Sequence, residues 1–101
     1  MVNATERAKD VLRNKLIACR AGPEEGVRLY PRSNGSFVLS IGTELSGDQV
    51  LEHEGFKVLL IGVEYFCMLD GAVIDCRDTR EGPVLFVQID QTSKNYGNRA
   101  E

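Results

Sequence analysis

The segment at residues 56–61, FKVLLI, is the feature that most constrains the fold. It is rich in aliphatic residues and becomes apolar on both faces towards its end. A strand of this kind needs cover on both sides, so we expect it in the interior of a sheet and not at an edge. Residues 49–52 predict its hairpin partner, reached across the turn residues His53, Glu54 and Gly55.

Four other short runs have the composition of strands, with β-branched, aromatic and aliphatic residues between turn-rich segments. The turn between the first two contains Asn34-Gly35, a hairpin signal because both residues tolerate positive φ. The turn between the last two ends at Pro83, whose missing N–H matters least where a strand begins. The predicted strands cover residues 27–30, 37–41, 72–77 and 84–89.

One amphipathic helix is predicted at residues 6–19, before the first strand. Thr5 is positioned to cap its N-terminus, and Glu6 is favourable beside the positive helix end. Gly22 and Pro23 follow the helix and stop it from continuing. The apolar residues at helical spacing are Ala8, Val11, Leu12 and Leu16.

Two segments fit neither pattern. In residues 62–71 the apolar side chains are too crowded for alternation, which predicts a short buried helix or helical turn ending at Gly71. Residues 91–101 are polar apart from Tyr96, and we expect a disordered tail. At 101 residues the chain has room for one core, so residues 1–90 are predicted to form one β-rich α+β domain of twisted, mostly antiparallel sheets.

Charge and hydropathy limit the partners. The chain has 15 acidic and 12 basic residues with no long run of one sign, so it lacks the basic face that nucleic acid requires. We find no basic-then-apolar leader and no apolar run near the ~18 residues that span a bilayer. We therefore expect neither nucleic acid nor a membrane as a partner, and a cytoplasmic protein. The exposed hairpin edges are compatible with a homodimer.

Several short motifs follow one another along the chain after the helix entry at Thr5-Glu6. They are Gly26-Val27-Arg28-Leu29, Gly35-Ser36-Phe37, Gly47-Asp48-x-Val50, Gly55-x-Lys57-Val58-Leu59 and Leu69-Asp70-Gly71-x-x-Ile74-Asp75. Each fragment alone is common in β-rich proteins, but their joint order is specific. In this order they resemble the A-type iron-sulfur carrier (HesB-like) family over residues 2–90. The resemblance implies the HesB-like fold, with an N-terminal helix and a short second helix.

The chain departs from that family at the cluster ligands. The family places one ligand cysteine in the loop of the first hairpin, near Asn34 here, and closes with a Cys-Gly-Cys pair. This sequence has Ser33 and Asn34 in the loop, and residues 91–101 contain no cysteine. Iron-sulfur clusters are held by ionised thiolates, which amide and hydroxyl groups replace poorly. We therefore expect no bound cofactor and no cluster transfer by the usual mechanism of the family.

The three cysteines, an odd number without C-x-x-C spacing, argue against a disulfide framework and favour a reducing compartment. Cys67 and Cys76 flank the Gly71 turn and are the candidates for binding a metal. Burial of both in the core is the favoured interpretation, because free cysteine is among the most buried residue types. Cys19, at the helix end, is a candidate for oxidation if it is exposed.

His53 is the single histidine and lies beside Glu52 and Glu54, where it can supply one ligand to a surface metal. Because no second ligand occurs at a suitable spacing, a solvated turn residue is the favoured interpretation. Asp70 and Asp75 invite an acid-base interpretation. Roles at a turn and a strand end are favoured for both, because Asp-Gly is turn chemistry.

Arg28, Arg32 and Lys57 are candidates for a basic patch facing an acidic partner, with isolated surface charges as the default. The sequence contains no G-x-S-x-G, no H-E-x-x-H and no Cys/His pairing, so we expect no catalytic residues and no enzyme.

Three hypotheses remain. The first is a non-catalytic accessory protein that binds an unknown protein partner, linked to iron-sulfur or sulfur metabolism by the resemblance. The second is an iron or iron-sulfur carrier that uses Cys67 and Cys76. The third is a redox-regulated protein in which Cys19 or Cys76 forms an intermolecular disulfide.

Overall fold

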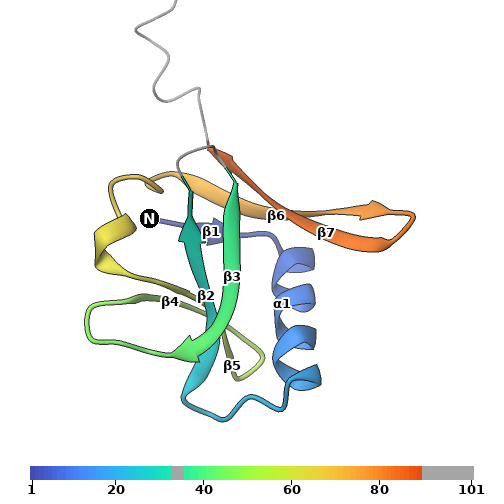
Figure 1. The fold of residues 1–101 in the computed structure, drawn as a ribbon, viewed down its shortest axis with the longest axis horizontal. Coiled ribbons are helices and arrows are strands. Elements are labelled where there is room, and N and C mark those ends of the chain that lie inside the picture. Colours follow the sequence, from blue (N-terminus) through green and yellow to red (C-terminus); the bar gives the residue numbers. More distant parts are fainter. Residues whose placement is uncertain (33–35, 90–101) are drawn as a thin grey trace, which may run out of the picture.

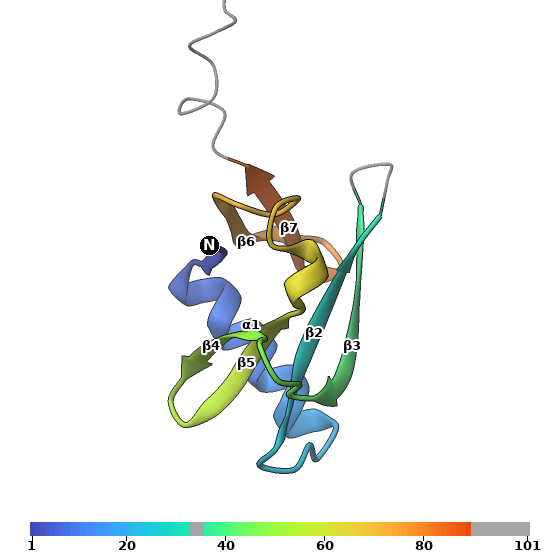
Figure 2. The same cartoon turned by 90° about the vertical axis from the view of Figure 1, so that its left-hand side faces the viewer.

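Two sheets and one helix make up the part of the chain that the computed structural model describes, residues 1–32 and 36–89 (Figures 1 and 2). One sheet has the strand order β3-β2-β5-β4 and the other has the order β1-β6-β7. The elements are β1 (Asn3–Ala4), α1 (Glu6–Ala18), β2 (Glu25–Pro31), β3 (Phe37–Thr43), β4 (Gln49–His53), β5 (Phe56–Ile61), the 3₁₀ helix η1 (Val63–Tyr65), β6 (Ala72–Thr79) and β7 (Gly82–Ile89).

The helix α1 confirms the prediction, ending one residue early. Thr5 is the N-cap, and its hydroxyl accepts a hydrogen bond of 3.2 Å from the backbone N–H of Ala8. Ala8, Leu12 and Leu16 form the buried stripe. This stripe packs against β5 and β6, so the helix covers one face of the molecule, as Figure 1 shows.

The four-stranded sheet confirms the position expected for residues 56–61. β5 lies between β2 and β4, and the side chains from Val58 to Ile61 are fully buried. β2 and β3, like β4 and β5, pair antiparallel, but β2 and β5 run parallel. A Cβ on Gly26 would lie 2.3 Å from the carbonyl oxygen of Lys57, so β2 can approach β5 this closely only with glycine there.

The three-stranded sheet contains one strand that the sequence pattern missed. β6 and β7 form the predicted antiparallel hairpin, extended at its turn end to Thr79 and Gly82. β1 pairs parallel with β6, with Asn3 opposite Val73. Val2 is buried beside this strand, and Thr5 N–H donates to the carbonyl of Ile74 at 2.9 Å. Two residues are too short for a periodicity, so only tertiary packing makes β1 a strand.

The prediction of a short buried helix in residues 62–71 is wrong about burial. The segment forms the single turn η1 and then irregular turns, and Val63, Phe66 and Met68 are all exposed. Leu69 is buried in the core, and Tyr65 packs against the core while partly exposed. The segment connects β5 to β6 along the surface, and Figure 2 shows no strand or helix lying over it. Its apolar side chains therefore have nothing to pack under.

The buried side chains form one hydrophobic cluster in which α1, both sheets and Leu69 take part. No helix in the described ranges is long and apolar enough to cross a membrane. The tip of the first hairpin and residues 91–101 lie outside the described residues, so the Asn34-Gly35 turn, the disordered tail and the boundary at residue 90 stay predictions.

Candidate functional site

The sequence shows how the cysteines of this chain lie relative to the ligand positions that the resemblance implies. No cysteine occurs between Cys19 and Cys67, and none follows Cys76. Residues 33–35, which the resemblance aligns with a ligand position of the family, therefore include no cysteine.

Cys67 lies in the turn after η1 and is exposed. Its predicted burial is wrong, because the turns after η1 leave this side chain at the surface together with those of Phe66 and Met68. The thiol lines a groove of about 700 Å³. The groove is bounded by Met1, Val2, Gly47, Asp48, Gln49, Phe66, Cys67 and Asp70.

Cys76 has a different environment from Cys67. It lies on β6 opposite Leu85, is half-buried, and packs against the core cluster. The Arg7 guanidinium forms an ion pair with Asp78, and the Cys76 side chain and Asp78 together raise the pKa of Arg7. Cys19 is the exposed C-cap residue of α1. In the described part of the chain, none of these thiols belongs to a group of three metal-ligating side chains.

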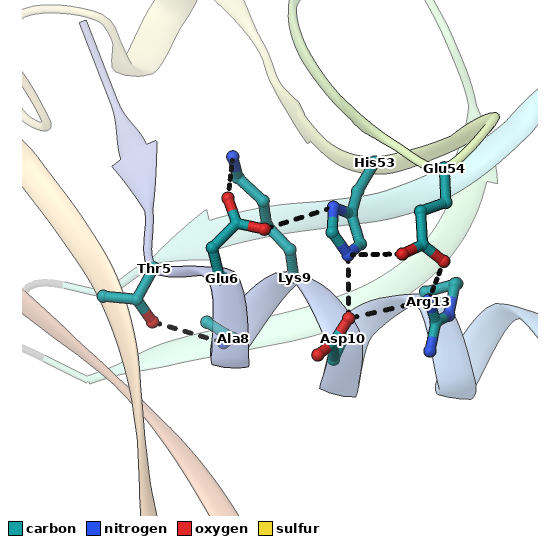
Figure 3. Close-up of polar contacts among 8 residues, drawn as sticks. All are labelled: Thr5, Glu6, Ala8, Lys9, Asp10, Arg13, His53 and Glu54. Carbon is teal, nitrogen blue, oxygen red and sulfur yellow. Dashed lines mark hydrogen bonds and ion pairs between the residues drawn. The ribbon is translucent and has the colours of Figure 1, made fainter.

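His53 has partners that the sequence pattern did not indicate (Figure 3). Its Nε2 lies 2.8 Å from Oδ1 of Asp10 on α1 and 3.8 Å from Oε2 of Glu54. Its Nδ1 faces Oε1 of Glu6 at 3.8 Å. Its side chain is only 12% exposed, so the interpretation as a solvated turn residue is wrong. The reason is that the β4–β5 turn folds over α1, which covers the imidazole.

Charged side chains of α1 form a network of ion pairs around the β4–β5 turn. Lys9 pairs with Glu6 at 3.4 Å, and Arg13 pairs with Glu54 and lies 3.6 Å from Asp10. A sequence signal for this face did exist: Glu6 and Asp10 are four residues apart and therefore lie one helical turn apart on the same side. The sequence did not indicate that His53 is the partner of Asp10, because the two residues are 43 positions apart in the chain.

Arg28 and Asp48 form a buried ion pair. Arg28 is 8% exposed and the Asp48 side chain 2%, and two hydrogen bonds of 2.6 and 3.2 Å join the guanidinium to the carboxylate. Asp48 also accepts a hydrogen bond from Leu45 N–H at 2.7 Å. The Arg28 hydrogen bond lowers the pKa of Asp48, and the same contact raises the pKa of Arg28.

This pairing argues against the candidate basic patch, and it also departs from the favoured interpretation of isolated surface charges, because Arg28 is buried. Arg28 is neutralised inside the molecule, and Lys57 pairs with Glu44 at 2.9 Å, a contact that raises the pKa of Lys57. Of the three candidate residues, Arg32 is the one that the structure leaves exposed. The positions of basic residues along the strands do not reveal which of them form an ion pair with a carboxylate from another segment.

Asp70 and Asp75 have separate structural contacts. Asp70 forms an ion pair with the amino group of Met1. Asp75 accepts hydrogen bonds from the Thr5 hydroxyl at 2.9 Å and from Cys76 N–H at 2.7 Å. These contacts agree with the favoured roles at a turn and a strand.

Solved structures similar to this one include the following three. Escherichia coli SufA, involved in the biosynthesis of iron-sulfur clusters, has 22% identity and a TM-score of 0.70, with coverage of 87% of this chain and 84% of SufA. IscA with a [2Fe-2S] cluster has 15% identity and a TM-score of 0.64, covering 90% and 86%. A protein from Aquifex aeolicus has 18% identity and a TM-score of 0.57, covering 86% and 89%.

At these identities the likeness shows the fold alone. No protein-family model matches the sequence, and no curated protein matches it. The chain therefore has the HesB-like fold of the A-type iron-sulfur carriers SufA and IscA, which confirms the fold that the motif order implied. Its own chemistry has to be argued from its own residues.

Proposed function

We propose that this chain is a non-catalytic accessory protein that uses the HesB-like fold to bind a protein partner in iron-sulfur or sulfur metabolism. The observation that carries the proposal is the combination of a shared carrier fold with the absence of thiols where the resemblance places the cluster ligands. The odd number of cysteines, without C-x-x-C spacing, favours a reducing compartment, and we place the protein in the cytoplasm.

The argument depends on the softness of the ligands. Iron in sulfide clusters is held by thiolates, and Ser33 and Asn34 offer only a hydroxyl and an amide at the hairpin loop. Neither group ionises near neutral pH, so neither supplies the charge that stabilises the cluster. A scaffold changed in this way keeps its surfaces for recognition but loses its usual means of carrying a cluster.

The surface around η1 supports recognition of a protein. Phe66 borders the groove, and Val63 and Met68 are exposed on the same connection. Gly47 approaches Val63 closely, so the β3–β4 loop and η1 form one continuous surface. Exposed apolar side chains gathered in this way are typical of protein interaction sites.

A second candidate function, an iron or iron-sulfur carrier, is favoured by one observation. Cys67 is exposed and shares the groove with Asp70, so its thiol is open to a metal or to a second copy of the chain. Of the two cysteines in the redox hypothesis, Cys19 is exposed and open to oxidation, whereas Cys76 is half-buried.

Reconstitution with iron and sulfide under anaerobic conditions separates the two functions. We expect no visible charge-transfer band above that of a Cys67→Ser, Cys76→Ser double variant treated in the same way. Cys19→Ser serves as a matched control, because this residue lies away from both β6 and the groove. A stable band that the double variant loses would refute the accessory role and establish the carrier.

Recognition by the η1 surface is tested with Phe66→Ser and with Val84→Ser as its control, since Val84 is exposed on β7. Cross-linking in cells followed by mass spectrometry should join the η1 segment to an iron-sulfur assembly protein, and Phe66→Ser should abolish the cross-link. Equal cross-linking by both variants would contradict the use of this surface. Sedimentation velocity over a range of concentrations tests the homodimer.

A further inference from the structure

We infer that Asp10, His53 and Glu54 form a binding site for a divalent transition metal ion, with Zn²⁺ as the ion whose chemistry they fit. This inference goes beyond the proposed function, because the site lies on α1 and the β4–β5 turn and uses no thiol. In the described part of the chain, these are the residues whose ligand atoms converge in a group of three, all within 4.8 Å of one another.

The distances are close to those of a tetrahedral site. Zn²⁺ binds nitrogen and oxygen ligands at about 2.0–2.2 Å, which places neighbouring ligand atoms about 3.3 Å apart. His53 Nε2 lies 2.8 Å from the Asp10 carboxylate and 3.8 Å from the Glu54 carboxylate. The first separation must widen and the second shorten by about 0.5 Å. The separation between the Asp10 and Glu54 oxygens lies within 4.8 Å and must also come to about 3.3 Å, and side-chain rotation supplies these movements. Water would complete the coordination.

Glu6 stands where a second-sphere group is needed. Metal-bound imidazoles almost always donate their other N–H to a carboxylate or carbonyl, which fixes the tautomer. With Nε2 on the metal, Nδ1 carries the proton, and Glu6 Oε1 faces Nδ1 at 3.8 Å (Figure 3). The imidazole is also covered by the helix, so its orientation is set before an ion arrives.

The charge balance around His53 favours a cation. Three carboxylates, those of Glu6, Asp10 and Glu54, face the imidazole, and only Lys9 and Arg13 oppose them. With neutral histidine the group is left with one excess negative charge. Arg13 contacts both Asp10 and Glu54, so it holds the place that a metal ion would take and acts as a competitor.

Calorimetric titration with ZnCl₂ tests the site in a full-length chain carrying Cys19→Ser, Cys67→Ser and Cys76→Ser, because thiolates would otherwise bind Zn²⁺ first. We expect one ion per chain. His53→Gln should remove the binding, and Glu6→Gln should weaken it roughly tenfold to hundredfold. Arg13→Gln should tighten it, because this change frees both carboxylates. Glu81→Gln in the β6–β7 turn removes an equal charge and should change nothing.

Nitrogen NMR of the imidazole supplies a second measurement. Zn²⁺ should shift Nε2 of His53 while Nδ1 stays protonated. Absence of binding, or equal binding by His53→Gln, would overturn the inference and leave a purely structural ion-pair network. Far-UV circular dichroism shows whether His53→Gln folds. If it does not, Arg13→Gln and Glu6→Gln must still act in opposite directions, and equal effects would refute the site.

Discussion

Two charged groups join distant segments of this molecule, and they differ in what surrounds them. Arg28 and Asp48 are both buried, and the pair consists of one cation and one anion joined by two hydrogen bonds. The cluster around His53 is half open to water and carries an excess of carboxylates. Burial requires charges to be matched, because an unpaired ion in the interior is costly, whereas solvent tolerates an imbalance.

From this contrast we expect the largest loss of stability when the buried pair of Arg28 and Asp48 is broken. Asp48→Ala leaves Arg28 buried without its partner and should lower the free energy of unfolding by roughly 3–5 kcal/mol. Urea denaturation followed by circular dichroism measures the loss. The matched control is Asp78→Ala, which breaks the exposed pair with Arg7 and should cost far less, because solvent screens this pair. Equal losses in both variants would show that burial does not set the strength of these pairs.

Acid should act on the same buried pair, with a smaller effect. The pKa of Asp48 is lowered in the folded chain, while an aspartate in an unfolded chain has a pKa of about 3.9. Below that pH the unfolded chain binds more protons than the folded one. The stabilisation is therefore complete above about pH 4 and is lost as the pH falls through the folded pKa. Thermal melts between acid and neutral pH should show the loss, and Asp48→Asn should flatten this part of the profile. If the stability of Asp48→Asn fell with pH as steeply as that of the parent chain, Asp48 would not be the group responsible for the acid dependence.

The smallest effect is expected at the exposed cluster. Arg13→Gln should change the free energy of unfolding by less than about 1 kcal/mol, because partly hydrated ion pairs contribute little. In 1 M salt the difference between Arg13→Gln and the parent chain should disappear, since screening acts within about 3 Å. The cost of Asp48→Ala should persist in the same salt. A salt-insensitive Arg13 contribution would place this cluster in the same class as the buried pair.

The elements with a repeating pattern were predictable. The stripe of α1 and the apolar β5 follow from periodicity within a dozen residues, and their observed bounds agree with the expected ones to within a residue. β1 has no such pattern and forms only because β6 offers it a partner. The crowded residues 62–71 misled the prediction, because apolar composition does not say whether a layer exists to cover them.

The candidate site was predictable in its residue types but not in its constellation. The sequence singled out His53 with its neighbour Glu54, and also Cys67, but placed His53 in solvent and Cys67 in the core. The structure reverses both assignments, because α1 covers the imidazole and the connection from β5 to β6 exposes the thiol. Asp10 could not have been chosen in advance as the ligand partner of His53.

The primary structure alone settled the local patterns: one helix, the principal strands with a buried β5, and the lack of thiols at the hairpin loop and the chain end. The parallel pairing of β2 with β5, the burial of Arg28 against Asp48 and the meeting of Asp10 with His53 were settled only in three dimensions. Periodicity reports which face of a segment is apolar, but the choice among competing partners depends on which faces pack together once the whole core has formed.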